Sequence, residues 1–175
     1  MPGISVVLLI EDPGPQDGTT LPRPSTNGEQ IMSVTTRPSE SAPTQDVGTF
    51  LRDWFERLAE SGWTADVFLA HLSNDLVWTA TGSSPVSGTF HGLQAYTDGV
   101  YRKLDERLER WPTPRVERIL ADGQWGVVEF TSTGGLGKNG TDYNMRYCWL
   151  MHVTGDKIDQ VIGYYDQLKV AELFR

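Results

Sequence analysis

Asp166 is the residue of this sequence best placed for acid–base chemistry. It follows a run of apolar, strand-forming residues that includes Val161 and Ile162, and it shares strand alternation with Tyr164. If both side chains face the interior, the Asp166 carboxylate is desolvated and holds its proton more tightly, as a general acid or base near pH 7 requires. Two structural alternatives remain open. Asp166 could cap a short helix that follows it, or it could pair with Arg146.

The strand expected at 143–153 alternates between two sets of side chains, and only one set can line a pocket. One set contains Asn144 and Arg146. The other set is apolar and aromatic: Tyr143, Met145, Tyr147, Trp149 and Met151. We expect the aromatic set to face the pocket, where the hydroxyl of Tyr143 or Tyr147 would donate to a ligand oxygen. Arg146 would then lie on the opposite face.

Other elements supply further candidate walls for the same pocket. These are the aromatic residues Trp54, Phe68, Trp78, Phe90 and Tyr101, each of which could instead be plain core. Tyr164 joins them through its alternation with Asp166. Glu129 lies in the middle of an apolar strand, where it is either a pocket acid or a partner in a surface or dimer salt bridge.

No residue pattern indicates a metal or a cofactor, and we expect neither. His71, His91 and His152 lack the spacing of metal ligands, and Cys148, the single cysteine, is expected to be a buried and inert thiol. The glycine-rich run 134–139 lacks the first glycine and the final Ser or Thr of a phosphate-binding loop. It is expected to be a hairpin loop.

Charge and composition narrow the class of protein. The chain has 175 residues, with 15 basic and 23 acidic side chains and a net charge of −8, which argues against a nucleic-acid partner. It contains no apolar run of about 18 residues, so we expect no membrane span. The apolar run 4–10 has no basic residues before it, which makes a secretory signal improbable and a cytoplasmic location the expectation. Met32 could equally be the natural start.

A compositional boundary lies near residue 46. No Phe, Trp or Tyr precedes Phe50, and seven of the ten prolines lie between Pro2 and Pro43. Such a segment buries too little apolar surface to offset its ordering entropy. We therefore predict a flexible tail over 1–45 and one folded domain over 46–175.

Hydrophobic periodicity predicts helices followed by strands within that domain. Helices are expected at 46–61, from Thr64 onward, from Leu93 to about Glu109, and at 168–174. Strands are expected at 75–81, 115–120, 125–133, 143–153 and 157–166, with a short extended piece at 89–90. This order is typical of an α+β fold with a curved antiparallel sheet. Apolar residues assigned to the far side of the sheet (Val128, Phe130, Leu150 and Ile162) predict a partner sheet and a homodimer.

This order of elements resembles the cone-shaped α+β barrel of the nuclear transport factor two-like superfamily, in which a mixed sheet wraps around N-terminal helices. The segments 74–78 and 82–89 resemble the strand-turn-strand of ketosteroid isomerases. The segments 143–149, 156–158 and 164–166 resemble the last two strands of SnoaL-like proteins and of limonene epoxide hydrolase. The resemblance covers 47–175 and implies a pocket for a hydrophobic small molecule.

The resemblance also implies catalytic residues, and this sequence departs from them. The isomerases' base falls at Thr79, and their second carboxylate falls within 148–150, where no acid occurs. The epoxide hydrolases' Arg-x-Asp pair falls near Glu129 and Thr131, although Asp166 matches their final aspartate. We therefore expect a cofactor-free isomerase, cyclase or dehydratase acting on a cyclic or polyketide-like molecule through Asp166. The alternatives are an epoxide hydrolase with a changed catalytic set, a binding module without turnover, and a dimeric interaction domain.

Overall fold

The computed structural model describes residues 46–175, and the tail predicted for 1–45 lies outside the described residues. The helices are α1 (Val47–Ser61), α2 (Ala65–Leu69), α3 (Leu93–Tyr96), the π-helical turn η1 (Thr97–Tyr101), α4 (Arg102–Asp105) and α5 (Gln167–Leu173). The strands are β1 (Leu72–Ala80), β2 (Gly88–His91), β3 (Leu108–Arg110), β4 (Thr113–Asp122), β5 (Trp125–Thr133), β6 (Leu136–Gly137), β7 (Arg146–Thr154) and β8 (Lys157–Tyr164).

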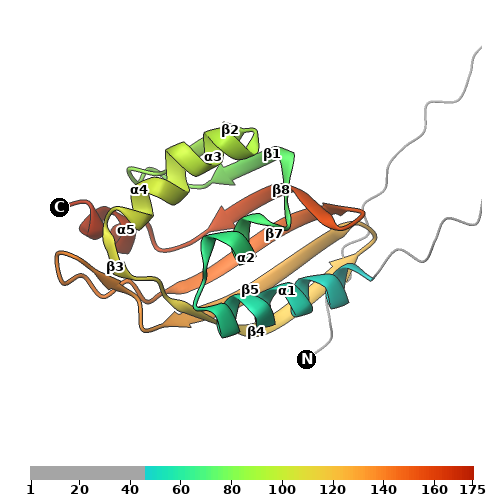
Figure 1. Ribbon diagram of the computed structural model, residues 1–175, viewed down its shortest axis with the longest axis horizontal. Coiled ribbons are helices and arrows are strands. Elements are labelled where there is room, and N and C mark those ends of the chain that lie inside the picture. Colours follow the sequence, from blue (N-terminus) through green and yellow to red (C-terminus); the bar gives the residue numbers. More distant parts are fainter. Residues whose placement is uncertain (1–45) are drawn as a thin grey trace, which may run out of the picture. The chain divides into compact units, whose positions relative to one another are not determined.

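Six of these strands form one mixed, curved sheet in the order β2-β1-β8-β7-β5-β4. Only the β1–β8 pair is parallel, and the other neighbours in this sheet are antiparallel. The sheet does not close into a complete barrel, because β2 and β4 are its two edges. Figure 1 shows α1 and α2 across one face of the sheet and the α3–α4 segment beside β1. The predicted α+β class with a curved, mixed sheet is confirmed.

Helix α1 attaches to the sheet through the apolar stripe expected from its sequence. Phe50, Trp54 and Leu58 are among its buried residues, and the helix packs against β4 and β5. Both ends of the helix are capped, as the unpaired backbone groups of helix termini require. The Asp46 carboxylate accepts a hydrogen bond from the Thr49 backbone N–H at 3.0 Å, and Gly62 ends the helix in the left-handed conformation.

The helix expected from Leu93 to about Glu109 is shorter and less regular than its pattern predicts. Its helical part ends at Asp105 and contains the π-helical turn η1, and the chain then enters β3. Gly99 lies inside η1, where a Cβ atom would come within 2.2 Å of the Phe90 ring. The segment therefore approaches β2 more closely than a side chain at position 99 would allow. Beyond it, Leu108 is drawn into β3 by pairing with Gly137 of β6.

The two sheet faces differ from the sequence-based assignment in one respect. Val128 and Phe130 are fully buried on the concave face, beneath α1, and not on the far face where the prediction placed them. Cross-strand register explains this, because Val128 pairs with Trp149 and Phe130 pairs with Tyr147, whose side chains also point inward. The convex face carries Val127, Leu150 and Ile162, which are only partly buried.

Candidate functional site

A cavity lies on the concave side of the sheet, between the sheet and the α2 and α3–α4 segments. The space between its lining atoms amounts to about 630 Å³ when the open mouth is included. Ten of its sixteen lining residues are aromatic: Trp63, Phe68, Trp78, Tyr96, Trp111, Phe130, Tyr143, Tyr147, Trp149 and Tyr165. Five of the other six are aliphatic: Ala80, Val86, Val100, Leu104 and Pro112. Ser132 is the last.

Strand alternation builds the sheet side of this cavity. Residues separated by two positions on a strand face the same side, so Tyr147 and Trp149 of β7 both point into the cavity. Phe130 lies opposite Tyr147 on β5, and their rings stack with centroids 4.6 Å apart. Trp149 meets the Phe130 ring edge-on at 5.0 Å. These contacts fix the ring orientations of Phe130, Tyr147 and Trp149, which form the floor of the cavity, before any ligand binds.

The helical side is built from Phe68, Tyr96 and Trp63. Tyr96 stacks on Trp78 of β1 with centroids 4.2 Å apart. Trp63 has a φ of 64°, a left-handed conformation that costs a non-glycine residue on the order of 1–3 kcal/mol. It is held there because its backbone N–H donates to the Leu58 carbonyl at 2.9 Å, closing the end of α1. This turn directs the Trp63 indole against the cavity.

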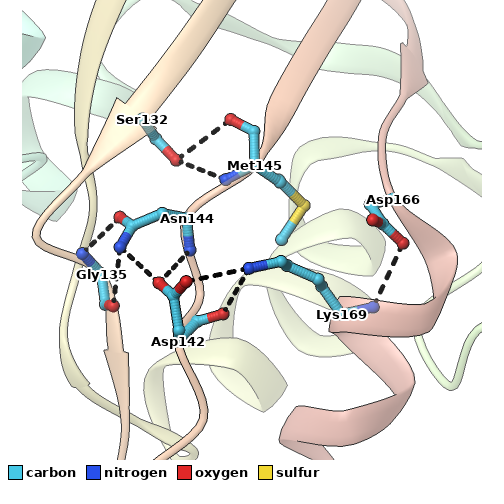
Figure 2. Close-up of polar contacts among 7 residues, drawn as sticks. All are labelled: Ser132, Gly135, Asp142, Asn144, Met145, Asp166 and Lys169. Carbon is cyan, nitrogen blue, oxygen red and sulfur yellow. Dashed lines mark hydrogen bonds and ion pairs between the residues drawn. The ribbon is translucent and has the colours of Figure 1, made fainter.

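Besides the indole N–H groups of its tryptophans, the polar side-chain groups of the cavity wall are hydroxyls. They belong to Ser132 and to the four tyrosines Tyr96, Tyr143, Tyr147 and Tyr165. The Ser132 hydroxyl is already engaged with the Met145 backbone, accepting from its N–H at 3.2 Å and lying 3.4 Å from its carbonyl oxygen (Figure 2). The hydroxyl of Tyr165 is buried and has no hydrogen-bond partner. No Asp, Glu, His, Lys or Arg is among the sixteen lining residues that the described part of the chain provides.

Burial keeps the phenols protonated. Desolvation raises the pKa of Tyr96 and of Tyr143 well above the usual phenol value, and neighbouring phenols raise them further. Burial likewise raises the pKa of Tyr147, and a hydrogen bond with Ser132 opposes part of that shift. Near neutral pH these side chains are therefore hydrogen-bond donors, and none of the three can act as a general base.

These shifts predict an alkaline loss of stability. Unfolded tyrosine releases its proton near pH 10, whereas the buried phenols hold theirs to higher pH. The contribution of these protonated, buried phenols to the free energy of unfolding is therefore complete below about pH 10 and is lost as the pH rises above it. Urea unfolding between pH 8 and pH 11.5 should show this decline, and Tyr143→Phe should have a shallower one. Equal slopes for the variant and the unmodified protein would contradict the assignment.

The expected pocket residues divide into three groups in the structure. Tyr143, Tyr147, Phe68, Trp78 and Trp149 line the cavity. Trp54, Tyr101, Met145 and Met151 are buried but lie outside the lining, as does the partly buried Phe90. Glu129, Tyr164 and Asp166 do not face the cavity at all.

The expectation that Asp166 faces the interior is wrong. The inward positions of this part of the chain are Val161, Gly163 and Tyr165, so Tyr164 and Asp166 have the opposite orientation. Asp166 is exposed and is the N-cap of α5, where its carboxylate accepts from the Leu168 and Lys169 backbone N–H groups at 2.9 and 3.3 Å. The structural alternative raised by the sequence, a helix cap, is the one observed. Arg146 pairs with Glu129 and not with Asp166.

Because Asp166 caps α5 at the surface, we expect its replacement to have a modest effect on stability and none on ligand binding in the cavity. Asp166→Ala should lower the free energy of unfolding by about 0.5–2 kcal/mol, and Asp166→Asn by less, because asparagine also caps helices well. Chemical denaturation of the three proteins measures this difference. A loss of all ligand binding in Asp166→Asn, with stability retained, would instead return Asp166 to the binding site.

A polar network anchors the segment that carries Tyr143. Figure 2 shows Asp142 between Asn144 and Lys169 of α5, whose ammonium donates to the Asp142 carboxylate at 3.0 Å. The Lys169 contact holds the pKa of the Asp142 carboxyl below its usual value. Asn144 in turn accepts from the Gly135 N–H at 2.8 Å. Backbone pairing in this segment is limited to isolated contacts, and β7 begins at Arg146 and not at Tyr143 as predicted.

Glu129 belongs to a charged cluster on the convex face. Its carboxylate pairs with Arg118 of β4 at 2.7 Å and with Arg146 of β7. The cluster borders an open trough that also contains Cys148 and Tyr164. Burial raises the pKa of the Cys148 thiol, and the nearby Glu129 carboxylate adds to this, so the thiol is not activated. The surface salt-bridge alternative for Glu129 is the observed arrangement.

Two further observations concern residues 46–175 only. This range holds no group of three or more His, Cys, Asp or Glu side chains positioned to bind a metal ion. It also holds no helix that is long and apolar enough to cross a membrane.

The fold and the buried cavity define a class of α+β proteins, and sequence comparison gives the family. Residues 51–161 match the family model of the SnoaL-like domain. The chain belongs to this family. A comparison with curated proteins finds no match.

Solved structures share the fold at low sequence identity. An NTF2-like protein from Burkholderia thailandensis is 17% identical with a TM-score of 0.61, over 75% of this chain and 98% of that chain. A protein from Mesorhizobium loti, named as a candidate SnoaL-like polyketide cyclase, is 21% identical with a TM-score of 0.54, over 68% and 98%. A hypothetical protein with a ketosteroid isomerase-like fold from Catenulispora acidiphila, in complex with trimethylamine, is 16% identical with a TM-score of 0.50, over 64% and 88%. At these identities the likeness concerns the fold.

Proposed function

We propose that this protein binds an uncharged, hydrophobic, ring-containing small molecule in its aromatic cavity and does so without acid–base turnover by the cavity wall. One observation carries the proposal: the sixteen described lining residues are aromatic, aliphatic or hydroxyl-bearing, and none is ionised at neutral pH. An apolar ligand gains roughly 25 cal/mol for each Å² of apolar surface that it buries there. A charged ligand would lose its hydration without gaining an ion pair.

The enzyme hypothesis is the second candidate. An isomerase, cyclase or dehydratase needs a proton acceptor near the substrate, and Asp166, the candidate base, caps α5 at the surface. The observation that still favours an enzyme is the group of tyrosine hydroxyls, which could stabilise a developing oxyanion. Polyketide-like and cyclic ketones fit either hypothesis. A cyclic ketone that is converted by the pure protein, with a rate abolished by a cavity variant, would raise the enzyme hypothesis to first place.

The charge of the ligand provides the direct test. Calorimetric titration with α-tetralone (uncharged), 1-naphthoate (an anion) and phenyltrimethylammonium (a cation) compares three ring compounds of similar size. We expect α-tetralone to bind at least about tenfold more tightly than 1-naphthoate, because the cavity holds no counter-charge. Binding of none of the three would contradict the proposed function.

The cation is included for a specific reason. The Catenulispora acidiphila protein was solved with trimethylamine, and aromatic rings attract alkylammonium groups. This cavity has ten aromatic residues, but its buried phenol hydroxyls favour a ligand with an oxygen atom. Tighter binding of phenyltrimethylammonium than of α-tetralone would replace the uncharged ligand in our proposal with a cationic one.

We also propose a homodimer through the convex face of the sheet. Val127, Leu150 and Ile162 form an apolar patch there, and Leu120 and Tyr164 extend it with exposed fractions of 63% and 49%. Such a patch favours burial against a second copy. Sedimentation should give a dimer that Ile162→Glu converts to a monomer, and a monomeric unmodified protein would contradict this.

The cytoplasmic location remains a prediction from the sequence.

A further inference from the structure

Trp111 lies in a part of the cavity wall that meets solvent. Thirteen of the sixteen lining residues are buried, and Leu104, Trp111 and Tyr165 are the three that are only partly buried. The hydroxyl end of Tyr165 is itself buried. Leu104 belongs to α4 and Trp111 follows β3, so these two lie in one short segment of the chain. A ligand must enter the cavity where its wall reaches the surface, and this segment forms such a place.

The Trp111 side chain reaches from the cavity to the surface. Its ring lines the cavity, and its indole N–H donates to the exposed Asp105 carboxylate at 2.8 Å. The ring is nearly parallel to the rings of Tyr101 and Trp63, whose centroids lie 4.9 and 6.4 Å from its own. Trp111 therefore spans the wall between η1, which contains Tyr101, and the turn after α1, which contains Trp63.

The segment that carries Trp111 is attached to the fold outside the main sheet. Strand β3 is not part of the six-stranded sheet and pairs with the two-residue strand β6, with an irregular register between Leu108 and Arg110. An indole has a single N–H, so the bond to Asp105 is the one hydrogen bond that the Trp111 side chain can donate, and it is exposed to solvent. Segments with short backbone pairing and exposed hydrogen bonds open locally at a low cost in free energy.

We propose that Trp111 is a gate through which the ligand enters and leaves the cavity, and that its hydrogen bond to Asp105 is the latch of this gate. The inference rests on the proposed function and concerns the rates of ligand exchange. For a ring compound to pass, the indole turns away from Tyr101 and the bond to Asp105 breaks. The latch is formed equally in the empty and the filled cavity, so it slows entry and exit by the same factor and leaves the affinity unchanged.

Two variants of Asp105 distinguish a gate from a simple contact with the ligand. Stopped-flow quenching of tryptophan fluorescence by α-tetralone gives the association and dissociation rate constants, since four tryptophans line the cavity. Asp105→Ala removes the acceptor, and we expect both rate constants to rise about fivefold, as the loss of one hydrogen bond implies, with the dissociation constant unchanged. Asp105→Asn keeps an acceptor oxygen for the indole, so its rate constants should stay within about twofold of those of the unmodified protein.

Asp98→Ala is the matched control. Asp98 is an exposed carboxylate of η1 that pairs with Arg102 at 2.9 Å, so its removal changes the charge of the neighbouring helical segment and leaves the Trp111 bond in place. Unchanged rate constants in a folded Asp105→Ala protein, a change in its dissociation rate constant alone, or an equal rise in Asp98→Ala would overturn the gate and leave the proposed function intact. Failure of α-tetralone to bind the unmodified protein would overturn the proposed function, and the gate with it.

Discussion

Replacing Ala80 with phenylalanine is expected to abolish ligand binding while the fold is retained. Ala80 ends β1, is 2% exposed, and lines the cavity. Its neighbours in register, Gly88 of β2 and Gly163 of β8, have no side chains, and because Ala80 lines the cavity the added ring is directed into it. We expect the affinity for α-tetralone to fall at least about 100-fold, because the ring occupies the ligand's volume.

The control for this variant is Thr79→Phe. Thr79 precedes Ala80 on the same strand, faces the opposite side, and contacts Thr89 through its hydroxyl. It should keep its affinity, and both variants should unfold within about 3 kcal/mol of the unmodified protein. Undiminished binding of α-tetralone by a folded Ala80→Phe protein would place the ligand outside the cavity.

The second large effect is expected at Phe55. This residue of α1 is 1% exposed, and its ring lies 4.9 Å from that of Phe130 and 6.0 Å from that of Trp149. It joins the helix to the strands whose other rings form the cavity floor. Phe55→Ala should lower the free energy of unfolding by about 3–5 kcal/mol, through lost apolar burial and the void left behind.

Chemical denaturation of Phe55→Ala measures this loss, with Leu168→Ala as its control. Leu168 is 74% exposed, so its truncation should change the free energy of unfolding by less than about 0.5 kcal/mol. A Phe55→Ala loss below about 1.5 kcal/mol would mean that α1 is not fixed to the sheet as described. The cavity floor would then not be preformed.

The class of fold could be predicted from the sequence because its elements have strong local signals. The stripe of Phe50, Trp54 and Leu58 has helical spacing, and Asp46 and Gly62 mark its two ends. The glycine turns at 123 and 155 mark two hairpins between long apolar strands. These signals lie within a few residues of one another, and tertiary contacts did not alter them.

The faces of the strands could not be predicted with the same success, because a shift of one residue reverses every side chain. Alternation is regular through β5 and from Val161 to Asp166. A regular pattern does not say which of its two sets of side chains faces inward, and the prediction placed Phe130 on the wrong face. It also turned Asp166 inward, whereas Tyr165 is the inward residue.

The cavity residues that sequence reasoning missed depend on tertiary contacts. Trp63 reaches the wall through a left-handed turn after Gly62, and Trp111 is held by a hydrogen bond from its indole N–H to Asp105 at 2.8 Å. Neither has a periodic signal. Tyr165 did have one, since it alternates with Val161 and Gly163, but the choice of an acidic residue as the catalytic group directed attention to its neighbour.

The most direct test of the central claim is a crystal structure of the protein grown with α-tetralone. We predict ligand density within the cavity, against Trp149 and Phe130. A cavity closed by its own side chains, with α-tetralone absent or bound only on the convex face, would contradict the assignment of this cavity as the binding site.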